Sequence, residues 1–216
     1  MTALTPEILL NAYTHGIFPM AETQDDPEIF WVDPEKRGIF PLDDFHVSKS
    51  LRKTIRKEPF KITVDTCFRQ IMKECAAPVE GRPSTWINQT ILDLYTDLHL
   101  QGNAHSIECW KDGILVGGLY GVSFAGVFCG ESMFSREKDA SKIALTALVA
   151  RLKHGGFRIL DTQFLTDHLA TLGAIEIERE EYHRLLDKAL SVDGDFHSLP
   201  LDCSATDILQ SITQTS

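Results

Sequence analysis

The sequence predicts an α/β fold with a sheet of mixed direction, and two patterns support this prediction. Residues 104–110 alternate between apolar and polar positions, and turn residues at 111–113 and 125–126 separate two further extended runs, as in an antiparallel meander. From residue 139 onward, helical and extended patterns alternate, which is typical of strands joined by crossover helices. The chain has 216 residues, of which 43% are hydrophobic and 24% charged, a composition typical of soluble globular proteins.

The first forty residues are expected to form a small lobe. Thr5 and Pro6 mark the N-cap and first turn of a helix that runs to residue 13 and ends before Gly16. Residues 16–40 are rich in proline and aromatic side chains and have no helical period, which predicts loops. We therefore divide the chain into a small N-terminal lobe at 1–40 and a larger domain at 41–216.

The larger domain begins with a basic helix within residues 46–61, and its other elements follow in order. We expect a strand at 60–64, a helix at 66–75, a loop at 78–85 and a helix at 88–100. Strands at 104–110, 114–124 and 124–134 precede a helix at 139–154, for which Asp139 is the expected N-cap. A strand at 157–163, a helix at 166–173, a strand at 174–179 and a helix at 180–190 follow. The tail from about residue 204 is expected to be frayed.

Residues 46–61 concentrate positive charge in an acidic chain. The segment holds six lysines or arginines and one acid, a local charge of +5, whereas the whole chain carries −10. Five of these cations recur at i, i+3, i+4, i+7 and i+8 and would share one helix face: Lys49, Arg52, Lys53, Arg56 and Lys57. This basic strip has two interpretations, a solvated helix face or a binding site for phosphates.

The strand at 157–163 ends in polar residues that can hold an amine. Period two places Asp161 and Gln163 on the same face, and a carboxylate and an amide oxygen both accept hydrogen bonds from an amine. The alternative is that Asp161 caps the following turn. Glu131 is a second candidate, because it lies in a run of small and apolar residues where an unpaired acid is costly.

Several classes of site are not expected. The five cysteines are odd in number and lack CxxC spacing, so neither a disulfide framework nor a zinc ribbon is predicted. The eight histidines show no HExxH or paired ligand spacing, so no metal is expected. The GxGxxG and P-loop motifs of nucleotide-binding sites are also absent. Without a signal peptide or a run of about 20 apolar residues, the chain is expected in the cytoplasm, with no membrane partner.

The order of strands and helices in the larger domain is the order found in N-acyltransferases that bind acyl-CoA. More specifically, seven segments resemble, in order and spacing, the leucyl/phenylalanyl-tRNA–protein transferases. They are GIFPM (16–20), FHVSKSLRK (45–53), STWINQTI (84–91), AHSIECWKDGILVGGLYGV (104–122), FCGESMFSR (128–136), DASKIAL (139–145) and LDTQFLTDHLATLGA (160–174). The resemblance extends from about residue 13 to residue 186, and FCGESMFSR followed by DxQ is its most specific part.

The resemblance implies an aminoacyltransferase with an acyl-CoA N-acyltransferase-like fold. Such an enzyme moves Leu or Phe, less often Met, from aminoacyl-tRNA to the N-terminal Arg or Lys of proteins, which marks them for degradation by the N-end rule. It implies Leu-tRNA and Phe-tRNA as donors, no metal, CoA or ATP, and a monomer.

The resemblance also assigns roles to residues of this chain. It implies that Asp161, Gln163 and Glu131 are catalytic and that the basic strip contacts tRNA. Trp86 and Met20 would hold the terminal adenosine, Met20 standing where better-known members carry a tryptophan. The pocket for the aminoacyl side chain would be built from six residues: Leu119, Phe128, Gly130, Leu148, Leu152 and Leu160.

Two other functions remain as alternatives. A CoA-dependent N-acetyltransferase would need a glycine-rich phosphate loop before its long helix, where this chain has SREKDAS. A non-catalytic tRNA-binding module would not need Asp161 beside Gln163.

Overall fold

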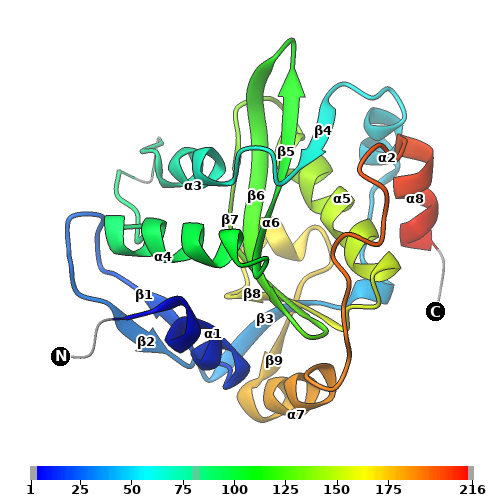
Figure 1. Cartoon of the computed structure of the whole chain (residues 1–216). Coiled ribbons are helices and arrows are strands. Elements are labelled where there is room, and N and C mark those ends of the chain that lie inside the picture. Colours follow the sequence, from blue (N-terminus) through cyan, green and yellow to red (C-terminus); the bar gives the residue numbers. More distant parts are fainter. Residues whose placement is uncertain (1–3, 80, 82, 214–216) are drawn as a thin grey trace.

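The computed structural model describes residues 4–79, 81 and 83–213, and its central feature is a seven-stranded sheet (Figure 1). The strands lie in the order β4 (Lys61–Val64), β5 (Ala104–Lys111), β6 (Ile114–Phe124), β7 (Val127–Ser135), β8 (Ile159–Gln163), β3 (Lys36–Phe40) and β9 (Ile175–Glu178). Neighbouring strands are antiparallel except for β7 and β8, which run parallel. The predicted α/β fold with a sheet of mixed direction is confirmed.

Helices cover both faces of the sheet (Figure 1). One face packs against α2 (Lys49–Ile55), α5 (Ala140–His154) and α8 (Ala205–Thr213), together with the 3-10 turn Leu42–Asp44. The other face packs against α1 (Pro6–Thr14), α3 (Phe68–Ala76), α4 (Gln89–Leu100) and α7 (Arg179–Ala189). The short α6 (Asp167–Ala170) lies between β8 and β9 in the chain. In the part of the chain that the structure describes, no helix is long and apolar enough to cross a membrane.

The predicted meander is confirmed, and β6 lies at its centre. Leu119 packs into the layer of α5, whereas the next residue, Tyr120, packs into the layer of α3 and α4. At the β5–β6 turn, Asp112 (φ 51°) and Gly113 (φ 78°) both take left-handed conformations, as a tight hairpin turn requires. Period two along β6 therefore supplies both hydrophobic layers of the core.

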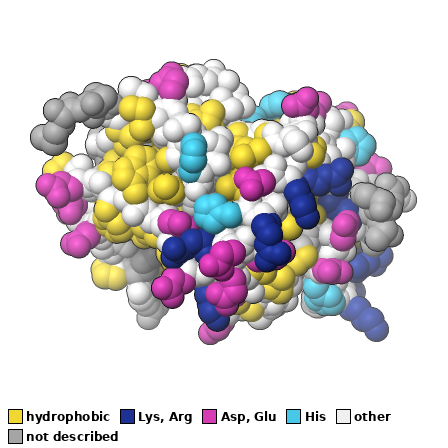
Figure 2. Space-filling model, turned by 90° about the horizontal axis from the view of Figure 1, so that it is seen from below, with side chains coloured by type: hydrophobic (Ala, Val, Ile, Leu, Met, Phe, Trp, Pro, Cys, Tyr) yellow, Lys and Arg dark blue, Asp and Glu magenta, His cyan; other side chains and the backbone are white. Residues whose placement is uncertain are grey.

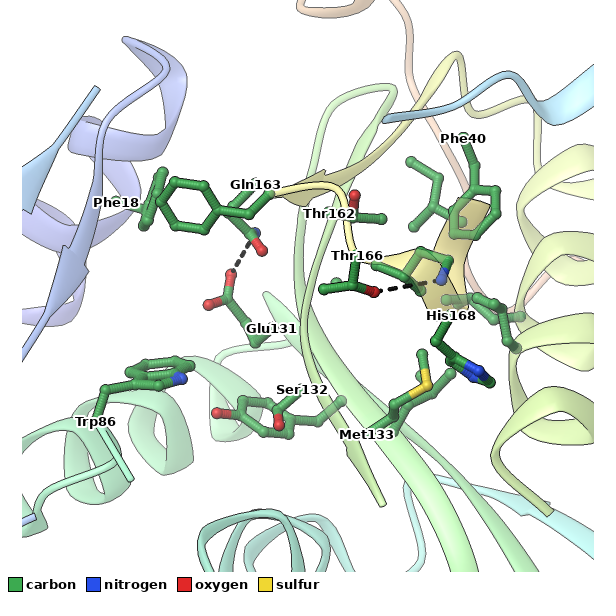
Figure 3. Close-up of a pocket in the computed structure, with 18 of the residues that line it drawn as sticks. Phe18, Phe40, Trp86, Glu131, Ser132, Met133, Thr162, Gln163, Thr166 and His168 are labelled. Carbon is green, nitrogen blue, oxygen red and sulfur yellow. Dashed lines mark hydrogen bonds between the residues drawn. The ribbon is translucent and has the colours of Figure 1, made fainter. Parts of the chain in front are cut away.

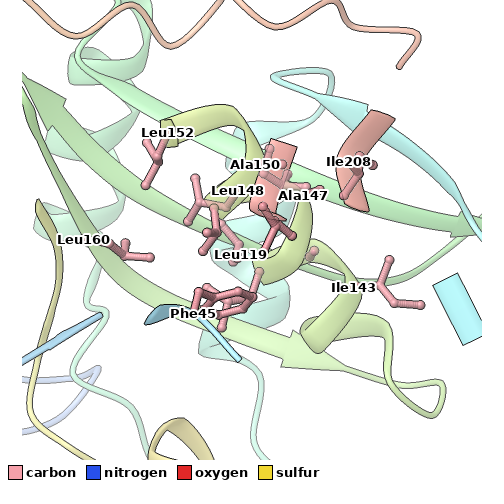
Figure 4. Close-up of a cluster of buried hydrophobic side chains, with 14 of the residues drawn as sticks. Phe45, Leu119, Ile143, Ala147, Leu148, Ala150, Leu152, Leu160 and Ile208 are labelled. Carbon is pink, nitrogen blue, oxygen red and sulfur yellow. The ribbon is translucent and has the colours of Figure 1, made fainter. Parts of the chain in front are cut away.

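Helix α5 is the most deeply buried helix in this part of the core, and Figure 4 shows its apolar side chains packed beside Leu119 and Leu160. It ends at Gly155, as the sequence predicts. Asp139 is the N-cap residue, as the sequence predicts. Asp139 takes a left-handed conformation (φ 66°), and its side chain makes no capping hydrogen bond.

The last five residues of the segment predicted as the N-terminal lobe form a strand of the main sheet. Helix α1 is confirmed, with Thr5 accepting a hydrogen bond from the Ile8 N–H at 3.3 Å, and β1 (Phe18–Met20) pairs with β2 (Phe30–Val32). Strand β3 lies between β8 and β9 in the main sheet and pairs antiparallel with both. A boundary after residue 40 thus separates β3 from the other strands of its sheet.

Residues 205–213 of the C-terminal tail form a helix, which corrects the expectation that the tail is frayed from about residue 204; residues 214–216 lie outside the described residues. This helix is α8, whose Ile208 and Ile212 side chains are buried in the same cluster as α5 (Figure 4). The Lys153 ammonium of α5 also donates to the Ile212 carbonyl at 3.2 Å. Burial of this apolar face offsets the entropy cost that would otherwise keep a chain end disordered.

Candidate active site

A cavity of about 320 Å³ opens where β7 and β8 separate (Figure 3). Only residues Val127–Cys129 of β7 pair with Ile159–Asp161 of β8, although β7 continues to Ser135. Residues beyond the paired stretch, such as Glu131 of β7 and Gln163 of β8, line the cavity. The divergence of two parallel strands therefore exposes polar groups next to an apolar hollow.

Four of the six residues expected in the aminoacyl pocket line this cavity: Leu119, Gly130, Leu148 and Leu160. The structure adds apolar lining residues that sequence reasoning missed: Phe40, Met133, Leu145 and Leu169. Leu145 carried a usable signal, because it precedes Leu148 by three positions on the same helix. Phe40 carried none, since its position depends on long-range strand pairing.

The other two, Phe128 and Leu152, are not among the residues that line the cavity. Both are fully buried in the core, and the Phe128 ring stacks on the Phe196 ring with centroids 5.6 Å apart. They share the core cluster of Leu148 and Leu160, so they support the cavity wall from behind. The structure therefore places these two residues in the core behind the cavity and not at its surface.

Glu131 is half-buried beside the cavity and surrounded by hydroxyl groups. The Tyr13 hydroxyl donates to Glu131 Oε1 at 2.7 Å, and the Tyr95 hydroxyl donates to Oε2 at 3.4 Å. Burial raises the pKa of Glu131 from 4.5 to about 8, although the hydrogen bond from Tyr13 opposes this shift. The carboxyl group therefore exchanges its proton near neutral pH.

Gln163 faces Glu131 across the mouth of the cavity (Figure 3). In one orientation its amide nitrogen donates to Glu131 Oε1 at 3.4 Å. When the amide is turned over, its nitrogen instead donates to the Gly130 carbonyl at 2.9 Å and the Thr162 carbonyl at 3.1 Å. The second orientation makes two shorter hydrogen bonds and points the amide oxygen toward Glu131. The two side chains then present acceptor atoms to the same space.

Asp161 lies behind Gln163 and is not among the residues that line the cavity. Its carboxylate is fully buried and forms a two-point ion pair with Arg37, at 2.9 Å from Nε and 2.6 Å from Nη2. Asp161 Oδ2 accepts from the Tyr182 hydroxyl at 2.9 Å, and Oδ1 accepts from the Gln163 N–H at 2.8 Å. This last bond holds the turn in which Gln163 takes a left-handed conformation (φ 58°). Asp161 thus does cap the turn, and through it positions Gln163.

Arg37, the ion-pair partner of Asp161, was also missed by sequence reasoning. It is 1% exposed, donates to the Gly16 carbonyl at 2.8 Å, and lies over the rings of Phe18 and Tyr182. Burial alone would lower the pKa of Arg37, but Asp161 raises it above its ordinary value. Its guanidinium therefore joins the N-terminal lobe to the end of β8.

Trp86 and Met20, the predicted adenosine contacts, both line the cavity. They also line an adjoining groove of about 670 Å³, together with Ser132 and Met133, which belong to both hollows. Figure 3 shows the Trp86 ring on the far side of Glu131 from Gln163. The structure thus brings both predicted residues to one opening.

The basic strip is exposed, but it is not one continuous helix face. Helix α2 ends at Ile55, so Arg56 is its C-cap and Lys57 lies in the following turn. Arg52 is half-buried and donates to the Val47 carbonyl at 3.1 Å, whereas Lys49, Lys53, Arg56 and Lys57 are exposed. Across residues 4–79, 81 and 83–213, no ion pair involves any of the five. Figure 2 views the molecule from below, the end away from α2, and on the face shown Lys and Arg side chains lie among Asp and Glu side chains.

The sequence matches one family of known proteins along most of its length. The profile of the leucyl/phenylalanyl-tRNA protein transferase family matches residues 39–187, and the profile of the N-terminal domain of the same transferase matches residues 2–35. The chain is 59% identical to the leucyl/phenylalanyl-tRNA–protein transferase of Rhodospirillum rubrum, over 91% of this chain and 92% of that protein. The transferase of the same name from Maricaulis maris is 51% identical over the full length of both chains.

A solved structure also shares the fold. The crystal structure of FemX superimposes with a TM-score of 0.50 and 11% identity, covering 82% of this chain and 70% of that chain. At this level of identity the likeness concerns the fold alone.

Proposed function

The chain belongs to the leucyl/phenylalanyl-tRNA protein transferase family, and from this premise we propose how its residues carry out the transfer. The enzyme transfers an aminoacyl group from tRNA to a protein. The donor group is leucyl or phenylalanyl, less often methionyl, and the acceptor is the α-amine of an N-terminal Arg or Lys. Because the donor is aminoacyl-tRNA, we propose that the enzyme acts in the cytoplasm.

One observation carries the assignment of the reaction site. Glu131 and the Gln163 amide face each other at the mouth of an apolar cavity, with acceptor atoms directed into the same space. A carboxylate and an amide oxygen together suit an amino group, which donates to both. Leu119, Leu148 and Leu160 offer an apolar wall to a leucyl or phenylalanyl side chain beside that amino group.

The chemistry is aminolysis of an ester. The acceptor amine attacks the carbonyl carbon of the aminoacyl ester, a C–N bond forms, and the C–O bond to the ribose breaks. The amine loses one proton and the ribose oxygen gains one. Glu131 can relay this proton, because its pKa of about 8 lies close to that of an α-amine, about 7.7–8.0.

Asp161 acts indirectly in this scheme. Its carboxylate is occupied by Arg37, the Tyr182 hydroxyl and the Gln163 N–H, so we assign it the positioning of Gln163 instead of the removal of the amine proton. Trp86 and Met20 would hold the terminal adenosine, and the basic strip would bind the tRNA phosphates. Lys and Arg contacts to phosphate make such binding sensitive to salt.

The test is a transfer assay with Leu-tRNA or Phe-tRNA and a peptide that begins with Arg, read by the mass of the peptide. We expect Glu131→Gln and Gln163→Ala each to lower the rate by about 10²-fold, while the affinity for aminoacyl-tRNA stays near its wild-type value. Gln89→Ala, an exposed glutamine on α4, is the matched control. If Glu131→Gln and Gln163→Ala kept the wild-type rate, the site assignment would be wrong. If the wild-type protein bound tRNA without modifying any peptide, the chain would instead be a binding module.

A further inference from the structure

Three side chains with metal-ligating atoms meet on the sheet away from the cavity. Asp65 directly follows β4, His105 lies in β5, and His197 lies in the segment between α7 and α8. Their ligand atoms all lie within 4.8 Å of one another. None of the three lines the cavity described above, so the aminoacyl transfer reaction does not account for this cluster.

The distances suit a small cation. Asp65 Oδ2 is 2.8 Å from His105 Nδ1 and 3.6 Å from His197 Nε2. In a tetrahedral zinc site with bonds of about 2.0–2.1 Å, neighbouring ligand atoms are about 3.3 Å apart. The two observed distances lie on either side of that value, and the ligand atoms of all three side chains lie within 4.8 Å of one another.

The surroundings hold these ligands in place. The Ser106 N–H donates to Asp65 Oδ1 at 2.8 Å, which leaves Oδ2 directed at the two imidazoles. The His105 ring stacks on the Phe196 ring, with centroids 3.9 Å apart. The backbone N–H of His197 donates to Asp195 Oδ1 at 2.9 Å. Such outer contacts orient ligands in metal sites.

The nearby charges permit a cation. Asp65 and Asp195 both attract the guanidinium of Arg151, but its N–H groups donate to carbonyls of residues 196, 199 and 200. His99 is the next imidazole, with Nδ1 3.9 Å from Asp65 Oδ1, and its Nδ1 is already bonded to the Ala104 carbonyl. The ligand set is therefore two imidazoles and one carboxylate.

We propose that Asp65, His105 and His197 bind one divalent transition-metal cation of the zinc class, with a water molecule as the fourth ligand. Imidazole nitrogen with carboxylate oxygen is a ligand combination that zinc accepts. On binding, the cation replaces the hydrogen between His105 Nδ1 and Asp65 Oδ2. The bound cation would link the segment that contains His197 to strands β4 and β5 and so stabilise the fold.

The test uses the full-length protein, freed of metal with a chelator and then titrated with Co²⁺, whose visible absorption reports four-coordinate binding. We expect one equivalent of Co²⁺ to bind, to be displaced by Zn²⁺, and Zn²⁺ to raise the thermal unfolding midpoint, because a ligand of the folded state stabilises it. His197→Ala should weaken Co²⁺ binding by more than about tenfold. His197 is 57% exposed, so this variant is expected to fold.

His154→Ala, which removes an exposed histidine elsewhere, is the matched control and should bind Co²⁺ like the wild type. The proposal is overturned if no saturable binding occurs, or if His197→Ala and the wild type bind Co²⁺ equally. It is also overturned if a thiolate-to-cobalt absorption band assigns the ion to a cysteine, because no cysteine belongs to the cluster.

Discussion

Replacing Asp161 with asparagine removes one charge from a buried ion pair without changing the size of the side chain. Asp161 is 0% exposed and Arg37 is 1% exposed, so no water can solvate the guanidinium that is left behind. If the asparagine oxygen takes the place of Oδ1, the bonds from Arg37 Nε and the Gln163 N–H survive. The new amide nitrogen then faces Arg37 Nη2 and the Tyr182 hydroxyl in place of Oδ2.

The expected loss of stability is large. The two hydrogen bonds to Oδ2, from Arg37 Nη2 and from the Tyr182 hydroxyl, disappear, each of which costs about 1.5–3 kcal/mol, and Arg37 remains as an uncompensated buried charge. Removing one partner of a buried pair typically lowers the free energy of unfolding by about 3–5 kcal/mol. We expect Asp161→Asn to fall in that range. Arg37→Met should do the same, because it strands the opposite charge.

Urea denaturation of the wild type, both single variants and the double variant forms a thermodynamic cycle. We expect the double variant to lose far less stability than the two single losses added together, because no charge is left unpaired. Additive losses, or a loss below about 1 kcal/mol in Asp161→Asn, would refute the buried-pair reasoning. In the folded Asp161→Asn protein, transfer should fall less than in Gln163→Ala. A loss of about 10²-fold or more would show that Asp161 takes the proton itself.

Three further predictions concern other parts of the site. Because burial raises the pKa of Glu131 from 4.5 to about 8, the stability linked to its neutral form is present at low pH and lost as pH rises through about 8. Urea denaturation across this range should show a decline that Glu131→Gln lacks, and an equal decline in both proteins would contradict the assignment. Exchanging Lys53 and Arg56 for Glu should weaken tRNA binding and its salt dependence in a filter assay, yet spare transfer from aminoacyl-adenosine. Leu148→Ala should lower use of Leu relative to Phe in the transfer assay, whereas Leu152→Ala should cost about 2–5 kcal/mol of stability with selectivity unchanged.

Local patterns predicted most of the elements. The helix at 88–100, the meander at 104–134 and the end of α5 depend on side-chain period and turn residues within one segment, and all three are confirmed. The errors lie where distant contacts decide. Strand β3 contains Gly38 and lies between Pro34 and Pro41, so its local pattern predicts a loop, and α8 is ordered by packing against α5.

The candidate site shows the same division. Spacing placed Asp161 near Gln163, and the structure agrees to the extent of one hydrogen bond between them. Spacing could not show that Arg37, 124 positions earlier, occupies the Asp161 carboxylate. Nor could it show that Phe128 lies behind the cavity wall, because period two assigns a face to a strand residue but not its distance from an opening.

The place of β3 between β8 and β9 also bears on how the chain folds during its synthesis. Its register partners are residues 160–163 and 175–178, so β3 leaves the ribosome long before the strands that flank it exist. Contacts of such high sequence separation are slow to form, and folding during translation proceeds from the N-terminus. The charge of Arg37, which lies on β3, therefore stays without its carboxylate partner until Asp161 has been synthesised. The reaction site can therefore form only after β8 has been synthesised, and a truncated nascent chain that lacks β8 cannot display it.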